Sequence, residues 1–137
     1  MFGQHEGGCL CGQIRYRLDG DPVDAGFCHC RMCQRASGAP VVAWVTARTA
    51  HVTFAGPDPL AYRSSPGARR FFCGRCGTPL AFQADATPDL LDLTVASLDQ
   101  PNLMPPHYHI WTQSRIAWFD TRDPLPRHTD SGPDQVG

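Results

Sequence analysis

The cysteines constrain this chain more than any other feature, because all seven fall into three short clusters. The clusters are Cys9-Leu10-Cys11, Cys28-His29-Cys30-Arg31-Met32-Cys33 and Cys73-Gly74-Arg75-Cys76. An odd number of cysteines leaves at least one outside any set of intrachain disulfides, and thiolates two or three residues apart can reach one metal ion from a tight turn. The pattern therefore favours metal binding over disulfides, inert buried thiols or a redox pair.

Alternation of apolar and polar residues predicts a half-buried strand over residues 12–18, with Ile14, Tyr16 and Leu18 on its inner side. Further β-rich runs are separated by turns that contain proline, which resists both helix and central strand. These runs are residues 40–46, 50–54, 60–63, 69–72, 80–83, 91–96, 109–112 and 115–119. Only residues 32–37 have the character of a helical turn. A mainly β fold of short strands follows.

The length of 137 residues, of which 42% are hydrophobic, fits one domain with a modest core. We expect a single zinc-binding domain over residues 1–127. Residues 128–137 lose the apolar periodicity and gather proline, aspartate and glycine, so they are expected to form a mobile tail.

The first and third clusters each hold two cysteines, too few to complete a tetrahedral site alone. If Cys9 and Cys11 meet Cys73 and Cys76, four thiolates bind one zinc ion and tie together segments about sixty residues apart. We expect Gly74 and Gly77 to supply positive φ angles in the turn, and Arg70 and Arg75 to offset the negative charge of this site. Such a site is closed and structural.

The middle cluster then offers Cys28, Cys30 and Cys33 to a second ion, which leaves one coordination position for water or substrate. A thiol bound there loses its proton, and an aldehyde oxygen there is polarised. The alternative is a second structural site with a histidine as fourth ligand, and the candidates are His29, His107 and His109.

Arg31 and Arg35, with Ser37, flank this middle cluster and are candidates to bind the carboxylate of a peptide-like thiol. The alternative for both arginines is a solvated surface. His29 lies between two ligand candidates, where it either shuttles a proton or points away from the metal. Aromatic residues elsewhere are predicted to be core, namely Trp44, Phe71, Phe72, Phe82 and Trp118.

Charge and hydropathy exclude several classes of partner. The net charge is -1 and the pI is about 6.6, which gives no general attraction to nucleic acid. No apolar run reaches the roughly 18 residues of a membrane span, and no secretory signal is visible, so we expect a cytoplasmic protein. The sequence carries no signal for a particular oligomeric state.

Four segments, GGCLCGQIRY, CHCRMCQRASG, RRFFCGRCGTPLAF and PPHYHIWTQSRIAWF, resemble in content and order the glutathione-dependent formaldehyde-activating family, which includes centromere protein V. The resemblance spans residues 7–125. It implies a β-tent fold clipped by zinc, with a structural zinc at Cys9, Cys11, Cys73 and Cys76. It also implies a catalytic zinc at Cys28, Cys30 and Cys33, and a histidine at His109 that approaches the open site.

The activity implied by the resemblance is that of a carbon-sulfur lyase, similar to S-hydroxymethylglutathione synthase. Such a protein joins a small thiol, glutathione or a relative of it, to formaldehyde or another aldehyde, or catalyses the reverse. The alternative is a non-catalytic zinc module that binds a thiol or a macromolecule. Of the arginines, only Arg63, Arg69, Arg70 and Arg75 cluster in a way that favours nucleic acid.

Overall fold

The computed structural model describes residues 4–133, which form two β-sheets and one short α-helix, α1. The smaller sheet has the order β1-β2-β5, with β1 Gln4–Gly8, β2 Arg15–Asp19 and β5 Val52–Ala55. The larger sheet has the order β10-β3-β4-β9-β8-β7-β6. Its strands are β3 Asp24–Cys28, β4 Val42–Arg48, β6 Leu60–Ser65, β7 Ala68–Phe72, β8 Pro79–Ala84, β9 Leu90–Thr94 and β10 His109–Ile110.

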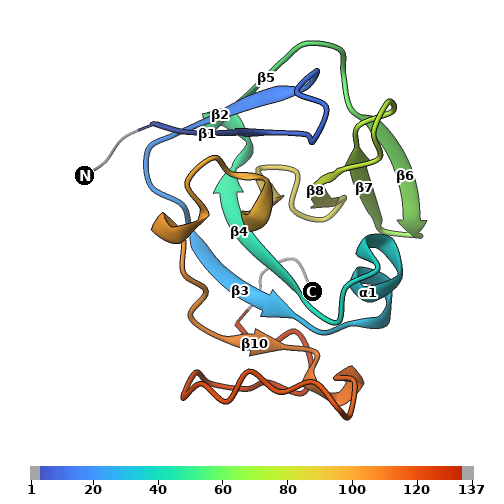
Figure 1. Cartoon of the computed structure of the whole chain (residues 1–137), viewed down its shortest axis with the longest axis vertical. Helices are drawn as coiled ribbons and strands as arrows, with labels where there is room; N and C mark the ends of the chain where they lie inside the picture. Colours follow the sequence, from blue (N-terminus) through green and yellow to red (C-terminus); the bar gives the residue numbers. More distant parts are fainter. Residues whose placement is uncertain (1–3, 134–137) are drawn as a thin grey trace.

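Helix α1, Arg31–Ser37, joins β3 to β4 and lies beside the end of the large sheet (Figure 1). Short 3-10 helices fill other connections: η1 Thr49–His51, η2 Val95–Ser97, η3 Pro101–Leu103 and η4 Thr112–Ser114. Within residues 4–133 no helix has both the length and the apolar character that a membrane span needs. All strand pairs are antiparallel except β10 with β3, which is parallel.

The predicted mainly β class is confirmed, and so is the helical turn within residues 32–37. One predicted strand, residues 115–119, is wrong. There the Arg115 guanidinium donates hydrogen bonds to the backbone carbonyls of Ile116, Ala117 and Phe119, and this local network replaces a strand ladder.

Two strands, β1 and β3, were not predicted, because β1 has no apolar alternation and both strands contain glycine. Gly7 in β1 and Gly26 in β3 each lie against a tyrosine ring. A Cβ atom at Gly7 would lie 2.5 Å from Tyr16, and one at Gly26 would lie 2.3 Å from Tyr108. These glycines are required by contacts between distant segments, which a local sequence pattern does not reveal.

The main hydrophobic core lies between the two sheets. Tyr16 and Leu18 of β2 point inward as predicted, and they pack with Val45 of β4 and Leu93 of β9. Along β4, Val45 and Ala47 are buried in this core, and Trp44 and Thr46 occupy the alternate positions. Because successive side chains of a strand point to opposite faces, the residues between these core positions face the other side of the large sheet.

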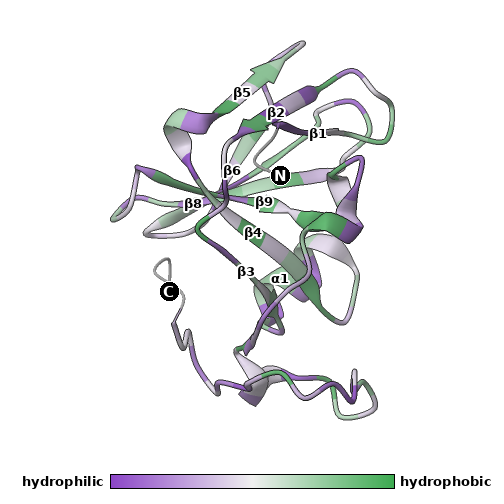
Figure 2. Ribbon diagram, turned by 90° about the vertical axis from the view of Figure 1, so that its left-hand side faces the viewer, coloured by the Kyte–Doolittle hydropathy of each residue, from purple (hydrophilic) through white to green (hydrophobic). Residues whose placement is uncertain are grey.

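The chain after β10 folds back along the edge of the large sheet (Figures 1 and 2). The His109 N–H donates to the Pro126 carbonyl at 2.8 Å, and the His128 N–H donates to the His109 carbonyl at 2.9 Å. The Trp111 N–H donates to the Asp130 carbonyl at 2.9 Å. The mobility expected from residue 128 onward stays a prediction, and residues 134–137 lie outside the described residues.

Leu93→Ala is expected to lower the free energy of unfolding by about 2 to 5 kcal/mol, because Leu93 is fully buried between the sheets. Leu103→Ala, at a leucine that is 57% exposed, is the matched control and should change it by at most about 0.5 kcal/mol. Urea unfolding followed by circular dichroism, at equal metal content, measures both. Equal effects of the two substitutions would contradict a core shared by the sheets.

Candidate metal centre

The turns after β1 and β7 bring together four cysteines that are far apart in the sequence. The sulfurs of Cys9, Cys11, Cys73 and Cys76 all lie within 4.8 Å of one another. Cys9 and Cys11 are 3.5 Å apart, and Cys11 and Cys73 are 3.9 Å apart. Ligands at about 2.3 Å in a tetrahedron lie about 3.8 Å apart, so the four sulfurs have the spacing of a tetrahedral donor set.

Backbone N–H groups already point at these sulfurs. The Ile14 N–H donates to Cys9 Sγ at 3.3 Å, and the Arg75 and Cys76 N–H groups donate to Cys73 Sγ at 3.3 and 3.4 Å. The Thr78 hydroxyl lies 3.2 Å from Cys76 Sγ, and this hydrogen bond contributes most to lowering the pKa of Cys76 to about 5. Donors of this kind stabilise thiolates, and thiolates are the form that binds a metal.

The glycines of the third cluster differ in their roles. Gly77 has a φ of 79°, as predicted. Gly74 does not have a positive φ, so that part of the prediction is wrong. A Cβ atom at Gly74 would lie 2.9 Å from a methyl carbon of Leu60, so this glycine makes room for a neighbouring strand.

The second group of sulfurs comes from Cys28 at the end of β3, Cys30 just before α1 and Cys33 in its first turn. These three sulfurs also lie within 4.8 Å of one another, and those of Cys28 and Cys33 are 3.5 Å apart. Cys30 caps the helix, because its sulfur accepts a hydrogen bond from the Cys33 N–H at 3.2 Å. We call Cys28, Cys30 and Cys33 the cysteine trio.

The sulfurs of the trio differ strongly in acidity. Hydrogen bonding with Cys28 and then with Cys33 lowers the pKa of Cys30 to about 2, and attraction to Arg70 contributes in the same direction. Hydrogen bonding with Cys30 raises the pKa of Cys28. For Cys33, hydrogen bonding with Cys28 lowers the pKa, but hydrogen bonding with Cys30 and burial together outweigh it and raise the pKa. Cys30 is thus the sulfur that carries negative charge most readily.

Arg70 lies beside the trio. This corrects the prediction that it offsets the negative charge of the four-cysteine group. Both of its terminal nitrogens lie 3.6 Å from Cys33 Sγ. Its guanidinium also lies over the rings of Phe82 and Trp44, at 5.1 and 6.0 Å from their centres. The register of β7 with β8 pairs Arg70 with Phe82, and alternation places both on the face opposite the core. Arg75 is exposed in its turn.

The histidines form a separate chain of contacts. His29 Nε2 lies 2.8 Å from His109 Nδ1, and His109 Nε2 lies 3.1 Å from the carboxylate of Asp123. Burial lowers the pKa of His29 to about 4, so its ring is neutral near pH 7. Among the described residues no histidine nitrogen lies within the group that the trio forms, so the structure does not favour His29, His107 or His109 as a fourth ligand.

The residues predicted to flank the middle cluster differ in how close they lie to the trio. Arg31 donates a hydrogen bond to Gln34, whose own amide donates to the His29 carbonyl at 2.7 Å, so Arg31 belongs to the network around the trio. Arg35 is exposed on α1. The Ser37 hydroxyl donates to the Cys33 carbonyl at 2.7 Å. Trp118 is 77% exposed, so its assignment to the core is wrong.

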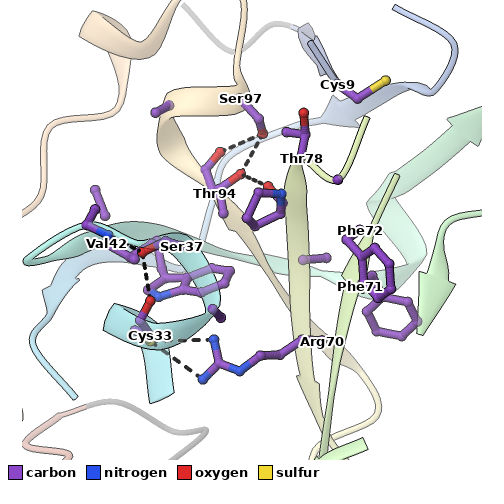
Figure 3. Close-up of a pocket in the computed structure, with 18 of the residues that line it drawn as sticks. Cys9, Cys33, Ser37, Val42, Arg70, Phe71, Phe72, Thr78, Thr94 and Ser97 are labelled. Carbon is purple, nitrogen blue, oxygen red and sulfur yellow. Dashed lines mark hydrogen bonds between the residues drawn. The ribbon is translucent and has the colours of Figure 1, made fainter. Parts of the chain in front are cut away.

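Two cavities flank the trio. The first has a volume of about 620 Å³ and lies between α1, the start of β4 and the strands β7 and β8 (Figure 3). The second, of about 530 Å³, is lined by all three cysteines of the trio and by Arg31. Cys33, Trp44 and Arg70 line both cavities. Trp44, Phe71, Phe72 and Phe82, predicted as core, are partly buried residues of the cavity walls.

The second cavity contains a polar pair that the sequence analysis missed. The Thr46 hydroxyl donates to a carboxylate oxygen of Asp92 at 2.5 Å, and both side chains are buried. The available signal was an aspartate within the apolar run LLDLTVA. Two neighbouring strands carry these residues, so their pairing depends on the sheet register.

Comparison with known proteins agrees with this architecture. A crystal structure of a Rhodobacter sphaeroides protein superposes with a TM-score of 0.57 at 21% identity, and the match covers 90% of this chain and 99% of that chain. A Schizosaccharomyces pombe protein named an uncharacterized lyase is 32% identical over 79 residues, which are 58% of this chain and 57% of that relative. A family model described as glutathione-dependent formaldehyde-activating enzyme matches residues 4–114. This confirms the predicted resemblance, and the chain belongs to the glutathione-dependent formaldehyde-activating family.

Proposed function

We propose that this protein is a zinc-dependent carbon-sulfur lyase that adds a small thiol such as glutathione to formaldehyde or a related aldehyde and catalyses the reverse cleavage. The trio carries this proposal, because its three converging sulfurs lie in the walls of cavities large enough for small reactants. The family match and the lyase name of the yeast relative support the same chemistry. Free thiols fit a reducing compartment such as the cytoplasm.

Each cysteine has a stated role in this proposal. Cys9, Cys11, Cys73 and Cys76 hold a structural zinc, whereas Cys28, Cys30 and Cys33 hold a catalytic one. A zinc ion with three thiolate ligands would lower the pKa of an incoming thiol and polarise an aldehyde oxygen. In the addition, the thiol S–H bond breaks, a carbon-sulfur bond forms, and the carbonyl oxygen gains a proton. The reverse reaction breaks the same carbon-sulfur bond.

Arg70 supplies positive charge at the reacting end of both cavities. Its guanidinium lies against Cys33 Sγ and is held by the rings of Phe82 and Trp44. Thiolate ligands around a divalent ion leave excess negative charge, and Arg70 offsets it while attracting an anionic thiol or a carbonyl oxygen that gains charge. Arg31 is at the wall of the second cavity, where it is suited to a carboxylate of the thiol.

The alternative, a non-catalytic module that binds nucleic acid, depends on a basic surface. Of the four clustered arginines, Arg63 pairs with Asp85 at 2.8 Å, Arg69 bonds Gln83 at 3.1 Å, and Arg70 points to Cys33. Three of the four are therefore engaged within the protein. This observation favours the small-molecule function.

Cys30→Ser is expected to reduce the zinc content from two ions per chain to one and to abolish turnover, while the circular dichroism spectrum is retained. The reason is that Cys30 belongs only to the trio. Elemental analysis and an addition assay corrected for the uncatalysed reaction measure these effects. Cys76→Ser is the matched substitution in the other group, and it should lower thermal stability as well. One zinc per chain in the wild type, unchanged in Cys30→Ser, would refute the second site.

Arg70→Gln is expected to lower kcat/KM for thiol addition about 10- to 100-fold, because a hydrogen bond to a charged group contributes about 1.5 to 3 kcal/mol. Arg69→Gln removes the same charge from the adjacent residue, which points to Gln83, and serves as the control. Steady-state kinetics of both variants at equal zinc content test the role of Arg70. Equal rates in the two variants would show that Arg70 does not act on the reacting groups.

A further inference from the structure

We infer that the first cavity binds the hydrocarbon part of an aldehyde, so that the protein acts on apolar aldehydes larger than formaldehyde. This inference rests on the proposed function for the identity of the bound molecule as the aldehyde. The chemical character of the cavity stands on its own, and it follows from the volume, the wall residues and the position of the charged group.

The volume exceeds what formaldehyde needs. Formaldehyde has one carbon and one oxygen, whereas about 620 Å³ lies within the range of about 300 to 1,000 Å³ of sites that hold drug-sized molecules. Small side chains leave this space open, and five of the wall residues are alanines. These are Ala36, Ala39, Ala43, Ala81 and Ala96. Rings of Phe71, Phe72 and Trp44 complete the walls.

The hydroxyl groups in the walls of the first cavity already form hydrogen bonds with other groups of the protein. Ser97 Oγ lies 2.7 Å from the Tyr16 hydroxyl, and Thr94 Oγ1 lies 2.9 Å from the Pro79 carbonyl. Thr78 Oγ1 accepts from the Leu10 N–H at 3.0 Å, and Ser37 bonds the Cys33 carbonyl. Figure 3 shows Thr94 and Ser97 bonded to each other. A peptide-like ligand would therefore find few partners here, whereas a hydrocarbon needs none.

One charged side chain lines the first cavity, and the sulfur of Cys9, from the four-cysteine group, lines it away from that side chain (Figure 3). Arg70 is the only arginine, lysine, aspartate or glutamate among the described residues that line the first cavity, and its guanidinium points to Cys33 (Figure 3). The walls thus suit a molecule with a polar carbonyl at the trio and an apolar chain extending from it. The second cavity, with Arg31 and Asp92, remains for the thiol. Each reactant then has a cavity, and the two cavities meet at Cys33, Trp44 and Arg70.

The first test measures binding without turnover. The zinc-loaded protein, labelled with ¹³C at alanine methyl groups, is titrated with 1-hexanol, an unreactive analogue of hexanal. Saturable shifts are expected for the alanines that line the cavity and not for Ala50, Ala55 or Ala61, which lie outside both cavities. Absence of these shifts would overturn the inference.

The second test fills the cavity from two sides. Ala96→Phe and Ala36→Phe each add a ring at a wall position, one in η2 and one in α1, and because both alanines are exposed the ring displaces no core residue. Each should weaken hexanol binding at least tenfold. Ala50→Phe, in the similar 3-10 helix η1, is the matched control and should not. Equal binding in all three variants would also overturn the inference.

The third test uses glutathione with linear aldehydes from propanal to heptanal. Each buried methylene is expected to raise kcat/KM about fourfold, and Ala96→Phe should remove this gain. Formaldehyde turnover without any gain along the series, and without hexanol shifts, would reject this inference and keep the proposed function. Hexanol binding in the cavity without thiol addition to any aldehyde would reject the proposed function and keep the cavity as an apolar binding site.

Discussion

The small and large sheets are joined where two cysteine-bearing turns meet. The turn after β1 belongs to the small sheet and the turn after β7 to the large one, and their four sulfurs lie within 4.8 Å. The hydrogen bond from the Leu10 N–H to Thr78 joins the same turns. The inward side chains of β2 then pack with those of β4 and β9 in the main core. In a chain of this size the core is small.

Side chains on the two faces of the large sheet have different roles, one in the core and one at the candidate site. One set of alternating residues, such as Val45 and Leu93, is buried in the core. The other set, including Trp44, Thr46, Asp92 and Arg70, lines the second cavity. A shift of one residue in strand register would exchange the two sets. The stability of the core and the chemistry of the site therefore depend on the same strand pairing.

The sequence revealed those features that depend on local pattern. Alternation located β2, turn residues located most other strands, and cysteine spacing separated the two sulfur groups, whose roles as metal ligands remain proposals. Features that depend on distant partners were missed. Arg70 of β7 lies beside Phe82 because of the register between β7 and β8. Position 26 needs a glycine because the ring of Tyr108 lies against it. Trp118 has the character of a core residue, yet it is exposed, in a segment where Arg115 binds the backbone carbonyls of Ile116 and Ala117.

Cys30 stands at the start of α1, so its proposed role as a zinc ligand is coupled to the stability of the helix. Its sulfur accepts the N–H of Cys33, one of the free N–H groups in the first turn of the helix, and this is a role for which serine and aspartate are preferred. A helix of seven residues has little stability of its own. Oxidation of this one sulfur would remove both a proposed zinc ligand and the helix cap, and it would weaken the turn that carries Cys33. Damage at Cys30 would therefore reach Cys33 as well, so that two of the three sulfurs in the trio depend on the state of one.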